Sequence, residues 1–438
     1  MKDVIVVGGG VAGLTAAREL LEAGLSVSLI EARTRVGGRL YSQEAGPNGD
    51  LLELGGQFFR PSKSPELQHE LCRYSVDVEP APVTSRQHVC YDGLIWDLSE
   101  EIQRSPGELL AFMRIVKRDA AALCLDGHAS RLHGLSVDAY LDQFTFTPIV
   151  RTWLWAWIEQ YAGNSLGQVS AASMLKLVSG AGGSIRAAGH SSAHFIKPST
   201  TSLTESIAND VKPAIRTGTA VTGVRRHDSG TGFVVDTPEG PEAAKAVILA
   251  VPRNVIAEGA LKIGVDLRVD AQVALTTPQP GYGYKVWARV AGKVPENTMI
   301  LGDMTGFRLL STGKTAADGS TWVVLFANNA TLGDKATDLE RWAKAAIRLV
   351  WRESTSVLEV KVHDWVADPH ARGAWTVTGI NGDSSVAALH AACPPDMAFI
   401  GADYFFERGG VESALRSAKD AAKLIRASLL GSSSKPSC

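Results

Sequence analysis

The chain has 438 residues, of which 45% are hydrophobic and 21% charged, and its formal net charge is −2. This is enough material for two or three globular domains. A charge balance so close to zero offers no general attraction to nucleic acid or to an anionic membrane. Five scattered cysteines, none in a CxxC pair, argue against a disulfide framework or a zinc site.

The two ends of the chain bear on where the protein works. An apolar run begins at Val4, which disfavours a signal peptide, and no stretch of about 20 apolar residues predicts a membrane span. We therefore expect a cytoplasmic protein without a membrane, nucleic-acid or metal partner. Residues 431–438 are polar and are expected to form a disordered tail. A homodimer stays open.

The start of the chain, as far as Ile30, has the pattern of a βαβ unit. Val4–Val7 form an apolar run that fits a buried parallel strand. Leu14, Ala17 and Leu20 follow at helical spacing before Gly24, and residues 26–30 predict a second strand. The glycines between the first strand and the helix therefore lie at a strand-to-helix turn.

These glycines predict a dinucleotide site. Gly8, Gly10 and Gly13 match G-x-G-x-x-G, which allows a tight turn, a close approach of backbone to a pyrophosphate, and helix–strand packing. Glu31 ends the second strand, where a carboxylate binds a ribose diol and repels a 2′-phosphate, which disfavours NADP. The cluster alone fits NAD or FAD.

Further along, the chain changes character twice. Residues 100 to 190 are rich in helix formers and Trp, and SGAGGSIRAAG at 179–189 is expected to be a loop. The later segments predict a meander (219–252), strands of a second sheet (284–292, 320–328 and 358–366) around a helix (338–353), and a closing strand and helix (397–403 and 412–430).

This order predicts an α/β fold with a discontinuous dinucleotide domain. Residues 1–80, 205–262 and 380–430 are expected to form that domain. An α+β substrate-binding domain, from residues 81–204 and 263–379, is expected to be inserted between them.

Several stretches together resemble one family. EARTRVGGRL, ELGGQFF, AVILAVP, YKVWARV, HDWVADPHARGAW and FIGADYFFERGGVESA occur in this order. They resemble the flavin-containing amine oxidases, and HDWVADP with the Trp-rich helix is nearest the hydroxynicotine oxidase branch. The resemblance implies a Rossmann-like FAD-binding domain of the GR2 type and an enzyme acting on C–N bonds.

The residues after the ribose acid then acquire roles toward FAD. Arg33 and Arg39 carry guanidinium groups able to meet phosphate oxygens and flavin carbonyls. Gly37 and Gly38 keep the backbone thin where a flat ring lies against it.

The resemblance implies further FAD contacts. It implies that Gly55, Gly56 and Gln57 lie beside the flavin ring and that Val221 touches the adenine through its backbone. It also implies that Asp403 lies near the ribityl chain. The helix beginning near Val411 would point its positive end at the flavin pyrimidine, which stabilises anionic reduced flavin. Simple packing of that helix is compatible with this role.

Lys285 is the candidate catalytic residue. A lysine on an apolar strand often points to solvent, but the family keeps a lysine here, bridged by water to flavin N5. Its charge would assist reoxidation, and the water would serve imine hydrolysis. No second dinucleotide motif is present, so an oxidase that uses O₂, or a protein acceptor, is favoured over a hydroxylase.

Two substrate-binding walls follow from the resemblance. Trp375 matches one aromatic wall of an amine cage, with a core tryptophan as the alternative. Gly410 stands where the family has the second aromatic, and the preceding loop is one residue shorter. Ala374 replaces the cysteine that links flavin in monoamine oxidases, so we expect non-covalent FAD. Gln160 is a candidate substrate contact or a packing residue.

The expected function is an FAD-dependent amine oxidase. Hydride passes from the carbon next to the substrate nitrogen to flavin N5, giving an imine or iminium, and O₂ reoxidation yields hydrogen peroxide. The half-open cage keeps an alternative: oxidation of a bulky amide or secondary amine in natural-product assembly, the iminium being trapped by cyclisation. An amino-acid oxidase is a weaker rival because no arginine could be assigned to its carboxylate. A desaturase and a non-enzymatic, flavin-free binding protein are weaker still.

Overall fold

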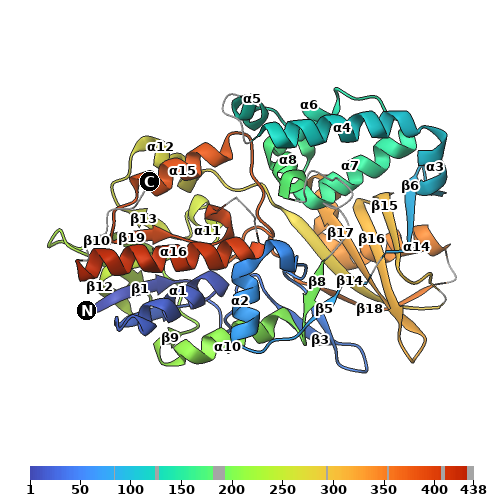
Figure 1. Cartoon of the computed structure of the whole chain (residues 1–438). Coiled ribbons are helices and arrows are strands. Elements are labelled where there is room, and N and C mark those ends of the chain that lie inside the picture. Colours follow the sequence, from blue (N-terminus) through green and yellow to red (C-terminus); the bar gives the residue numbers. More distant parts are fainter. Residues whose placement is uncertain are drawn as a thin grey trace.

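The computed structural model describes residues 1–82, 84–123, 128–180, 193–292, 294–352, 355–405 and 410–431. Two lobes lie side by side, each built around a sheet (Figure 1). The glycine-rich stretch from residue 181 on, Phe406–Arg408 of the short loop and the tail from residue 432 lie outside the described residues.

The first lobe is built on a mixed sheet with β1 near its centre. Over the described residues the strand order is β13–β10–β11–β12–β1–β2–β9. The long strand β12 pairs with β11 in its first half and with β19 at its end, so the final strand extends the sheet. The strands are β1 (Lys2–Val7), β2 (Val27–Ile30), β9 (Ile215–Arg216), β10 (Gly223–Arg226), β11 (Phe233–Thr237), β12 (Gly240–Leu249), β13 (Lys262–Gly264) and β19 (Met397–Phe399).

Helices cover both faces of this sheet, which explains the unbroken apolar run of β1. Val4 and Val6 face one helical layer, whereas Ile5 and Val7 face the other. The first layer is α1 (Val11–Glu22), α10 (Thr200–Val211) and α16 (Gly410–Leu430), and the second is α11 (Arg253–Ala257), α12 (Val269–Thr276) and α15 (Gly382–Ala392). The predicted βαβ opening is thus confirmed.

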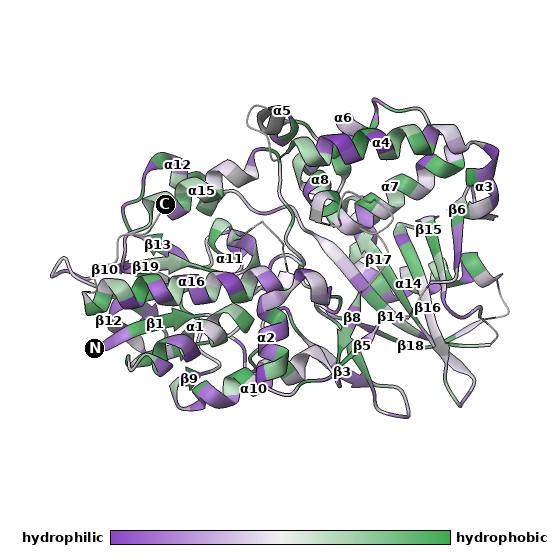
Figure 2. Cartoon of the chain, viewed as in Figure 1, coloured by the Kyte–Doolittle hydropathy of each residue, from purple (hydrophilic) through white to green (hydrophobic). Residues whose placement is uncertain are grey.

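The closing helix also agrees with its predicted amphipathic stripe. Ala414, Leu415, Ala418, Ala421 and Ile425 of α16 are buried against the first sheet. The helix carries alternating hydrophilic and hydrophobic patches (Figure 2). It lies beside α1, so the first and last helices of the described chain are neighbours (Figure 1).

The second lobe is a sheet with a helical cap. Over the described residues its strand order is β18–β14–β17–β16–β15–β6–β7. Helices α4, α7 and α8 lie over one face, and α14 lies on the other. The elements are β6 (Arg86–Tyr91), β7 (Leu94–Asp97), α3 (Leu98–Arg104), α4 (Pro106–Ala122), α5 (His128–Gly134), α6 (Val137–Leu141), α7 (Pro148–Ala162), α8 (Ala171–Gly180), β14 (Gly283–Ala291), β15 (Thr298–Met304), β16 (Phe307–Thr315), β17 (Ser320–Asn328), α13 (Asn329–Leu332), α14 (Leu339–Trp351) and β18 (Ser356–Val362).

Small elements connect the lobes. They are the hairpin β3 (Ser42–Ala45) and β4 (Asp50–Glu53), the helix α2 (Pro65–Arg73), and the pair β5 (Val78–Pro80) and β8 (His194–Ile196).

Two predicted strands are shorter than expected. The strand at 358–366 ends at Val362, because the side chain of Asp364 accepts the N–H groups of Val366 and Ala367 and turns the chain. In the meander, residues 219–222 precede the ladder, which begins at Gly223.

The predicted domain boundaries at residues 205 and 262 remain a proposal, and the packing of two helices leads us to revise them. Helix α10 begins before residue 205 and α12 lies after residue 262, yet both pack on the first sheet. We therefore propose that residues 200–276 belong with the dinucleotide domain. The fold class itself agrees with the prediction: an α/β dinucleotide-binding lobe joined to an α+β lobe.

Candidate functional site

One large cavity of about 940 Å³ contains nearly all the predicted site residues. Its lining comes from both lobes: the β1 turn, the loop after β2, α7, α8, β14 and the start of α16. The predicted residues that line it are Gly8, Gly10, Glu31, Arg33, Gly38, Arg39, Gly55, Gly56, Gln57, Gln160, Val221, Lys285, Trp375, Asp403, Gly410 and Val411.

Gly13 is the predicted residue that does not line the cavity, and its geometry explains why. A Cβ atom on Gly13 would lie 1.9 Å from the carbonyl oxygen of Gly8, so the helix packs directly on the turn. Gly8 itself has φ +104°. Helix α1 begins behind Gly10 with no side-chain cap and no acid in its first turn. Its N-terminus therefore offers N–H groups and positive potential to an anion.

Glu31 is held in place by backbone. Its Oε2 accepts the N–H of Gly9 at 2.6 Å, and its Oε1 accepts that of Arg33 at 2.9 Å. The Arg33 guanidinium does not stand alone, since Nη2 donates to Asp368 Oδ1 at 2.7 Å. Burial opposes ionisation of Asp368, but hydrogen bonds from His363 and Arg33 hold its pKa below the usual range. Arg33 therefore also ties Glu31 to the loop after β18.

The glycine pair Gly37 and Gly38 packs against the turn that contains Gly9 and Gly10. The N–H of Gly37 donates to the carbonyl of Gly9 at 2.8 Å. A Cβ on Gly38, whose φ is +58°, would lie 3.1 Å from Gly10 Cα. Residues without a Cβ atom are thus required where the two loops cross. The sequence analysis gave a different reason for these glycines, namely contact with a flat ring.

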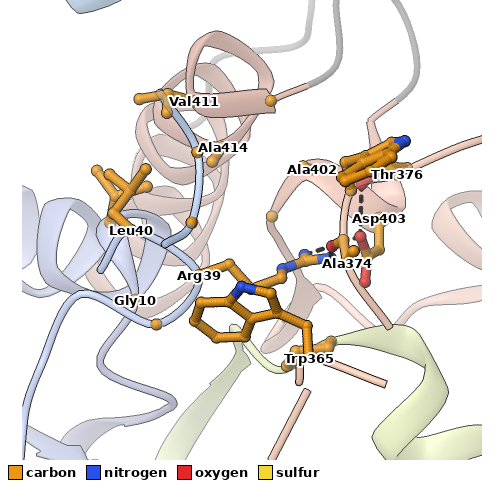
Figure 3. Close-up of a pocket in the computed structure, with 18 of the residues that line it drawn as sticks. Gly10, Arg39, Leu40, Trp365, Ala374, Thr376, Ala402, Asp403, Val411 and Ala414 are labelled. Carbon is orange, nitrogen blue, oxygen red and sulfur yellow. Dashed lines mark hydrogen bonds and ion pairs between the residues drawn. The ribbon is translucent and has the colours of Figure 1, made fainter. Parts of the chain in front are cut away.

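Arg39 joins the start of the chain to its end. Nη1 donates to the carbonyl of Ala374 and Nη2 to Asp403 Oδ1, both at 2.8 Å (Figure 3). Asp403 also accepts the Thr376 hydroxyl at 2.6 Å and the Arg253 N–H at 3.0 Å. Burial raises the pKa of Asp403, but the Arg39 charge and these hydrogen bonds outweigh it and lower the pKa.

Lys285 points into the cavity, so the solvent-facing alternative is wrong. The residue is 5% exposed, and Nζ donates to Gln57 Oε1 at 2.6 Å. Nζ also lies 5.4 Å from the centre of the Trp287 ring. Burial lowers the pKa of Lys285 to about 7, with the charge of Glu53 opposing the shift. The side chain can thus exchange a proton near neutral pH, as ammonium or as neutral amine.

Trp375 is fixed from three sides. Its Nε1 donates to the carbonyl of Tyr161 at 2.9 Å, and the edge of Phe326 meets it at 6.3 Å between ring centres. A Cβ on Gly283 would lie 2.1 Å from the Trp375 ring, and one on Gly163 would lie 2.9 Å from it. The two glycines therefore leave a slot that holds the indole at the cavity wall.

A second part of the lining is open at Gly410. This residue begins α16 with φ +58°, and a Cβ built on it would meet no atom of the described chain within 4 Å. Gln160, on α7, and Val411 line the same cavity.

Sequence reasoning missed six aromatic lining residues: Phe58, Phe59, Trp157, Tyr161, Phe326 and Trp365. Two of them had a signal. Phe58 follows Gly55–Gln57 directly. Phe326 lies opposite Lys285 in the ladder of β14 and β17, and alternation along β17 could have found it.

Within the described chain, no three His, Cys, Asp or Glu side chains gather so as to hold a metal ion. No described helix is both long and apolar enough to cross a bilayer.

The cavity suits an extended dinucleotide bearing a flat ring. Its lining includes the uncapped helix start and the carboxylate of Glu31, and a Cβ on Gly8 would lie 2.6 Å from the carbonyl oxygen of Ala250. Lys285 and Trp375 line the same cavity. These donors and acids could hold a dinucleotide cofactor.

Comparison with known proteins identifies a flavin-containing family. The family model described as flavin containing amine oxidoreductase matches residues 11–426. (S)-6-hydroxynicotine oxidase of Paenarthrobacter nicotinovorans is 29% identical over 97% of this chain and 99% of its own length. Nicotine dehydrogenase of Pseudomonas putida is 25% identical over 97% of this chain and 89% of its own.

Solved structures share the fold. A redesigned putrescine oxidase superposes with a TM-score of 0.82 at 20% identity, covering 97% of this chain and 98% of the other. Cyclohexylamine oxidase from Brevibacterium oxydans gives a TM-score of 0.81 at 18% identity, covering 98% of this chain and 99% of the other.

Proposed function

Because the chain belongs to the flavin-containing amine oxidoreductase family, an enzyme family acting on C–N bonds, we propose that it is an FAD-dependent amine oxidase. Bound flavin supplies the acceptor for a hydride from the carbon next to the substrate nitrogen, which leaves an imine or iminium. The observation that carries the proposal is the buried Lys285, which lines one cavity together with Trp375, Gly8 and Glu31.

FAD would be held without a covalent bond. Glu31 would bind the ribose, the start of α1 the pyrophosphate, and the Arg39–Asp403 pair would lie near the ribityl chain. None of the described residues lining the cavity is a cysteine, and Ala374 stands where a cysteine would link the flavin. Acid precipitation should therefore release all the flavin into the supernatant.

Lys285 would act on protons. With a pKa lowered to about 7 by burial, it donates or accepts a proton at neutral pH, and Gln57 fixes the direction of Nζ. In its charged form it stabilises negative charge that develops nearby during reoxidation. O₂ is the proposed acceptor, with hydrogen peroxide as product.

The substrate would be a secondary or cyclic amine. Trp375 forms one flat wall, and the open side at Gly410 admits more bulk than two facing aromatics would. The full-length likeness to a hydroxynicotine oxidase and a nicotine dehydrogenase supports this class. Because one of these relatives is a dehydrogenase, an electron acceptor other than O₂ is the competing possibility.

The same open side favours a second candidate. A Cβ on Gly410 would have no neighbour within 4 Å among the residues that the structure describes, which gives room for an acyl group on nitrogen. Oxidation of a bulky amide, followed by cyclisation of the iminium, is therefore the alternative.

The deciding experiment is spectroscopic. Purified protein should show flavin absorbance, and anaerobic addition of secondary, cyclic or N-acyl amines should bleach it. Readmission of air should restore the colour and release hydrogen peroxide in equal amount. Protein that does not bind FAD would overturn the proposal, whereas bleaching without reoxidation by air would limit it to a dehydrogenase.

A further inference from the structure

Glu53 is a buried carboxylate that is held by uncharged hydrogen-bond donors. It ends β4 and is 8% exposed. Its Oε1 accepts the N–H of Thr200 at 2.7 Å, and its Oε2 accepts the hydroxyls of Thr200 and Ser42 at 2.6 and 2.8 Å. These hydrogen bonds fix the carboxylate in place without cancelling its negative charge.

The end of β4 lies against Lys285. The Nζ atom of Lys285 is 3.4 Å from the carbonyl oxygen of Gly55, two residues after Glu53. The indole of Trp287 contacts both sides: its ring centre is 5.4 Å from Lys285 Nζ, and its Nε1 donates to the carbonyl of Glu53 at 2.9 Å. Because an extended chain advances about 3.3 Å per residue, these two contacts place Glu53 close to the amino group of the lysine.

The charged side chains on the same face of the second sheet are paired with one another. On the strand of Lys285, Arg289 Nε lies 3.6 Å from Glu359 Oε2. On β18, Lys361 Nζ lies 3.2 Å from the same carboxylate. On β17, the residue opposite Lys285 is Phe326, which carries no charge. Helix α14 packs on the other face of this sheet.

The titratable groups that line the cavity from other elements are engaged as well. Arg39 pairs with Asp403 at 2.8 Å. Tyr161 of α7 is uncharged at neutral pH. Three basic lining residues also have interaction partners of their own: Arg60, Lys63 and Lys176. Among these described groups, Glu53 is the acid beside Lys285 that is bound by uncharged donors alone.

The charge of Lys285 depends on the balance between burial and a nearby acid. Burial favours the neutral amine, and a buried lysine can have its pKa lowered to about 5 or 6, which would leave it neutral at pH 7. A carboxylate close by favours the ammonium, because charges interact strongly where water is scarce. In this protein burial is the larger effect, and with Glu53 opposing it the pKa of Lys285 is about 7.

We propose that Glu53 is a positioning residue for Lys285, whose fixed negative charge lets the buried lysine keep a proton at neutral pH. Glu53 does not line the described cavity, and it acts through the electrostatic potential at Nζ. The inference rests on the proposed role of Lys285 in flavin reoxidation. The competing explanation is purely structural, because Glu53 also accepts an N–H at the start of α10, a helix that its own N-cap side chain does not cap.

The first experiment follows the lysine directly by NMR, in full-length protein as purified, with lysine isotopically labelled at Cε. The Lys285 signal is the one that is lost in Lys285→Met. Its titration midpoint should be near pH 7 in the wild type. In Glu53→Gln, which keeps an acceptor for the Thr200 N–H and removes the charge, the midpoint should be about one pH unit lower.

Glu108→Gln is the matched control. Glu108 likewise accepts the N–H of a residue at a helix start, that of Thr147 before α7, at 3.1 Å. Loss of its charge should leave the midpoint of Lys285 unchanged.

The second experiment measures reoxidation of reduced flavin by O₂ against pH. If the ammonium form of Lys285 assists this step, a midpoint lowered by about one pH unit makes Glu53→Gln about 5-fold slower than wild type at pH 7 and nearly equal at pH 5. A purely structural role would lower the rate by the same factor at both pH values.

An unchanged NMR midpoint in Glu53→Gln, or an equal shift in Glu108→Gln, would overturn the proposal. If Glu53→Gln does not fold, the wild type alone decides. A midpoint below about pH 6 is that of a buried lysine without a counter-charge and overturns the proposal, whereas a midpoint near 7 supports it. These NMR results are independent of turnover, and amine oxidation itself fails only if no amine bleaches bound flavin.

Discussion

The Nζ atom of Lys285 lies 2.6 Å from Oε1 of Gln57, although the two residues are 228 positions apart in the chain. One belongs to the sheet of the second lobe and the other to the loop leaving the first, so the contact spans the two lobes. The amide accepts from the lysine in either protonation state and fixes its direction without fixing its charge. That arrangement suits a group whose protonation changes during a reaction.

Replacing this lysine should separate cofactor binding from turnover. Lys285→Met should slow reoxidation of reduced flavin by about 100-fold, because a preorganised positive charge is lost, while the Kd for FAD changes by less than about 3-fold. Stopped-flow mixing with O₂ and equilibrium dialysis measure the two effects. Lys361→Met on neighbouring β18, where Lys361 pairs with Glu359, is the control. Equal loss of both properties would assign Lys285 a structural role.

The buried lysine should also make stability depend on pH. Its pKa is lowered to about 7 in the folded protein, against about 10.4 when unfolded, so between these values the unfolded chain binds one more proton. This group therefore raises the free energy of unfolding as pH increases above 7, by up to roughly 1.4 kcal/mol per pH unit. The free energy of unfolding, measured by urea denaturation of apoprotein at pH 7 to 9, should rise less steeply with pH for Lys285→Met than for wild type. Parallel slopes would contradict the lowered pKa.

Filling the slot beneath the indole should disturb substrate binding. In Gly283→Ala the new methyl group would lie 2.1 Å from the Trp375 ring, so the ring must move. We expect KM for amines to rise about 10-fold, the cost of a contact worth about 1.4 kcal/mol, with FAD content unchanged. Gly107→Ala, where a Cβ meets nothing within 4 Å in the described part of the chain, is the matched control. A wild-type KM in Gly283→Ala would show that Trp375 is not a substrate wall.

Closing the open wall should reverse the size preference. Gly410→Tyr would place a ring where no described atom lies within 4 Å of the added Cβ, and should favour small amines over bulky ones by about 10-fold in relative kcat/KM. Because φ is +58° at this residue, Gly410→Asn serves as a control, since asparagine tolerates that backbone conformation. An unchanged preference in Gly410→Tyr, measured over an amine series, would remove Gly410 from the substrate site.

Local patterns in the sequence predicted the helices and strands better than they predicted which side chains contact one another. The βαβ unit follows from Val4–Val7, Gly13 and the helical spacing, all of which precede Glu31, and the structure has it. The partners of Arg33 and Arg39 are Asp368 and Asp403, which lie near the opposite end of the chain. No spacing rule links such residues, because only the packed fold brings them together.

The burial of Lys285 is a second property that the sequence pattern could not predict. Lys285 lies on a strand whose neighbours are apolar on both faces, so alternation alone left its direction open. The structure resolves it because the second sheet turns this face toward the first lobe, where Gln57 receives the side chain.

Asp403 has a consequence for how the protein is made. Its carboxylate joins Arg39, Thr376 and Arg253, and α16 follows to flank the cavity that the segment up to Leu40 begins. Under the proposed function, a nascent chain therefore carries its glycine turn and Glu31 for nearly the whole of translation before the residues that complete the FAD site are made. The proposed site is therefore complete only once the last helix is made, so we expect FAD to bind the finished chain.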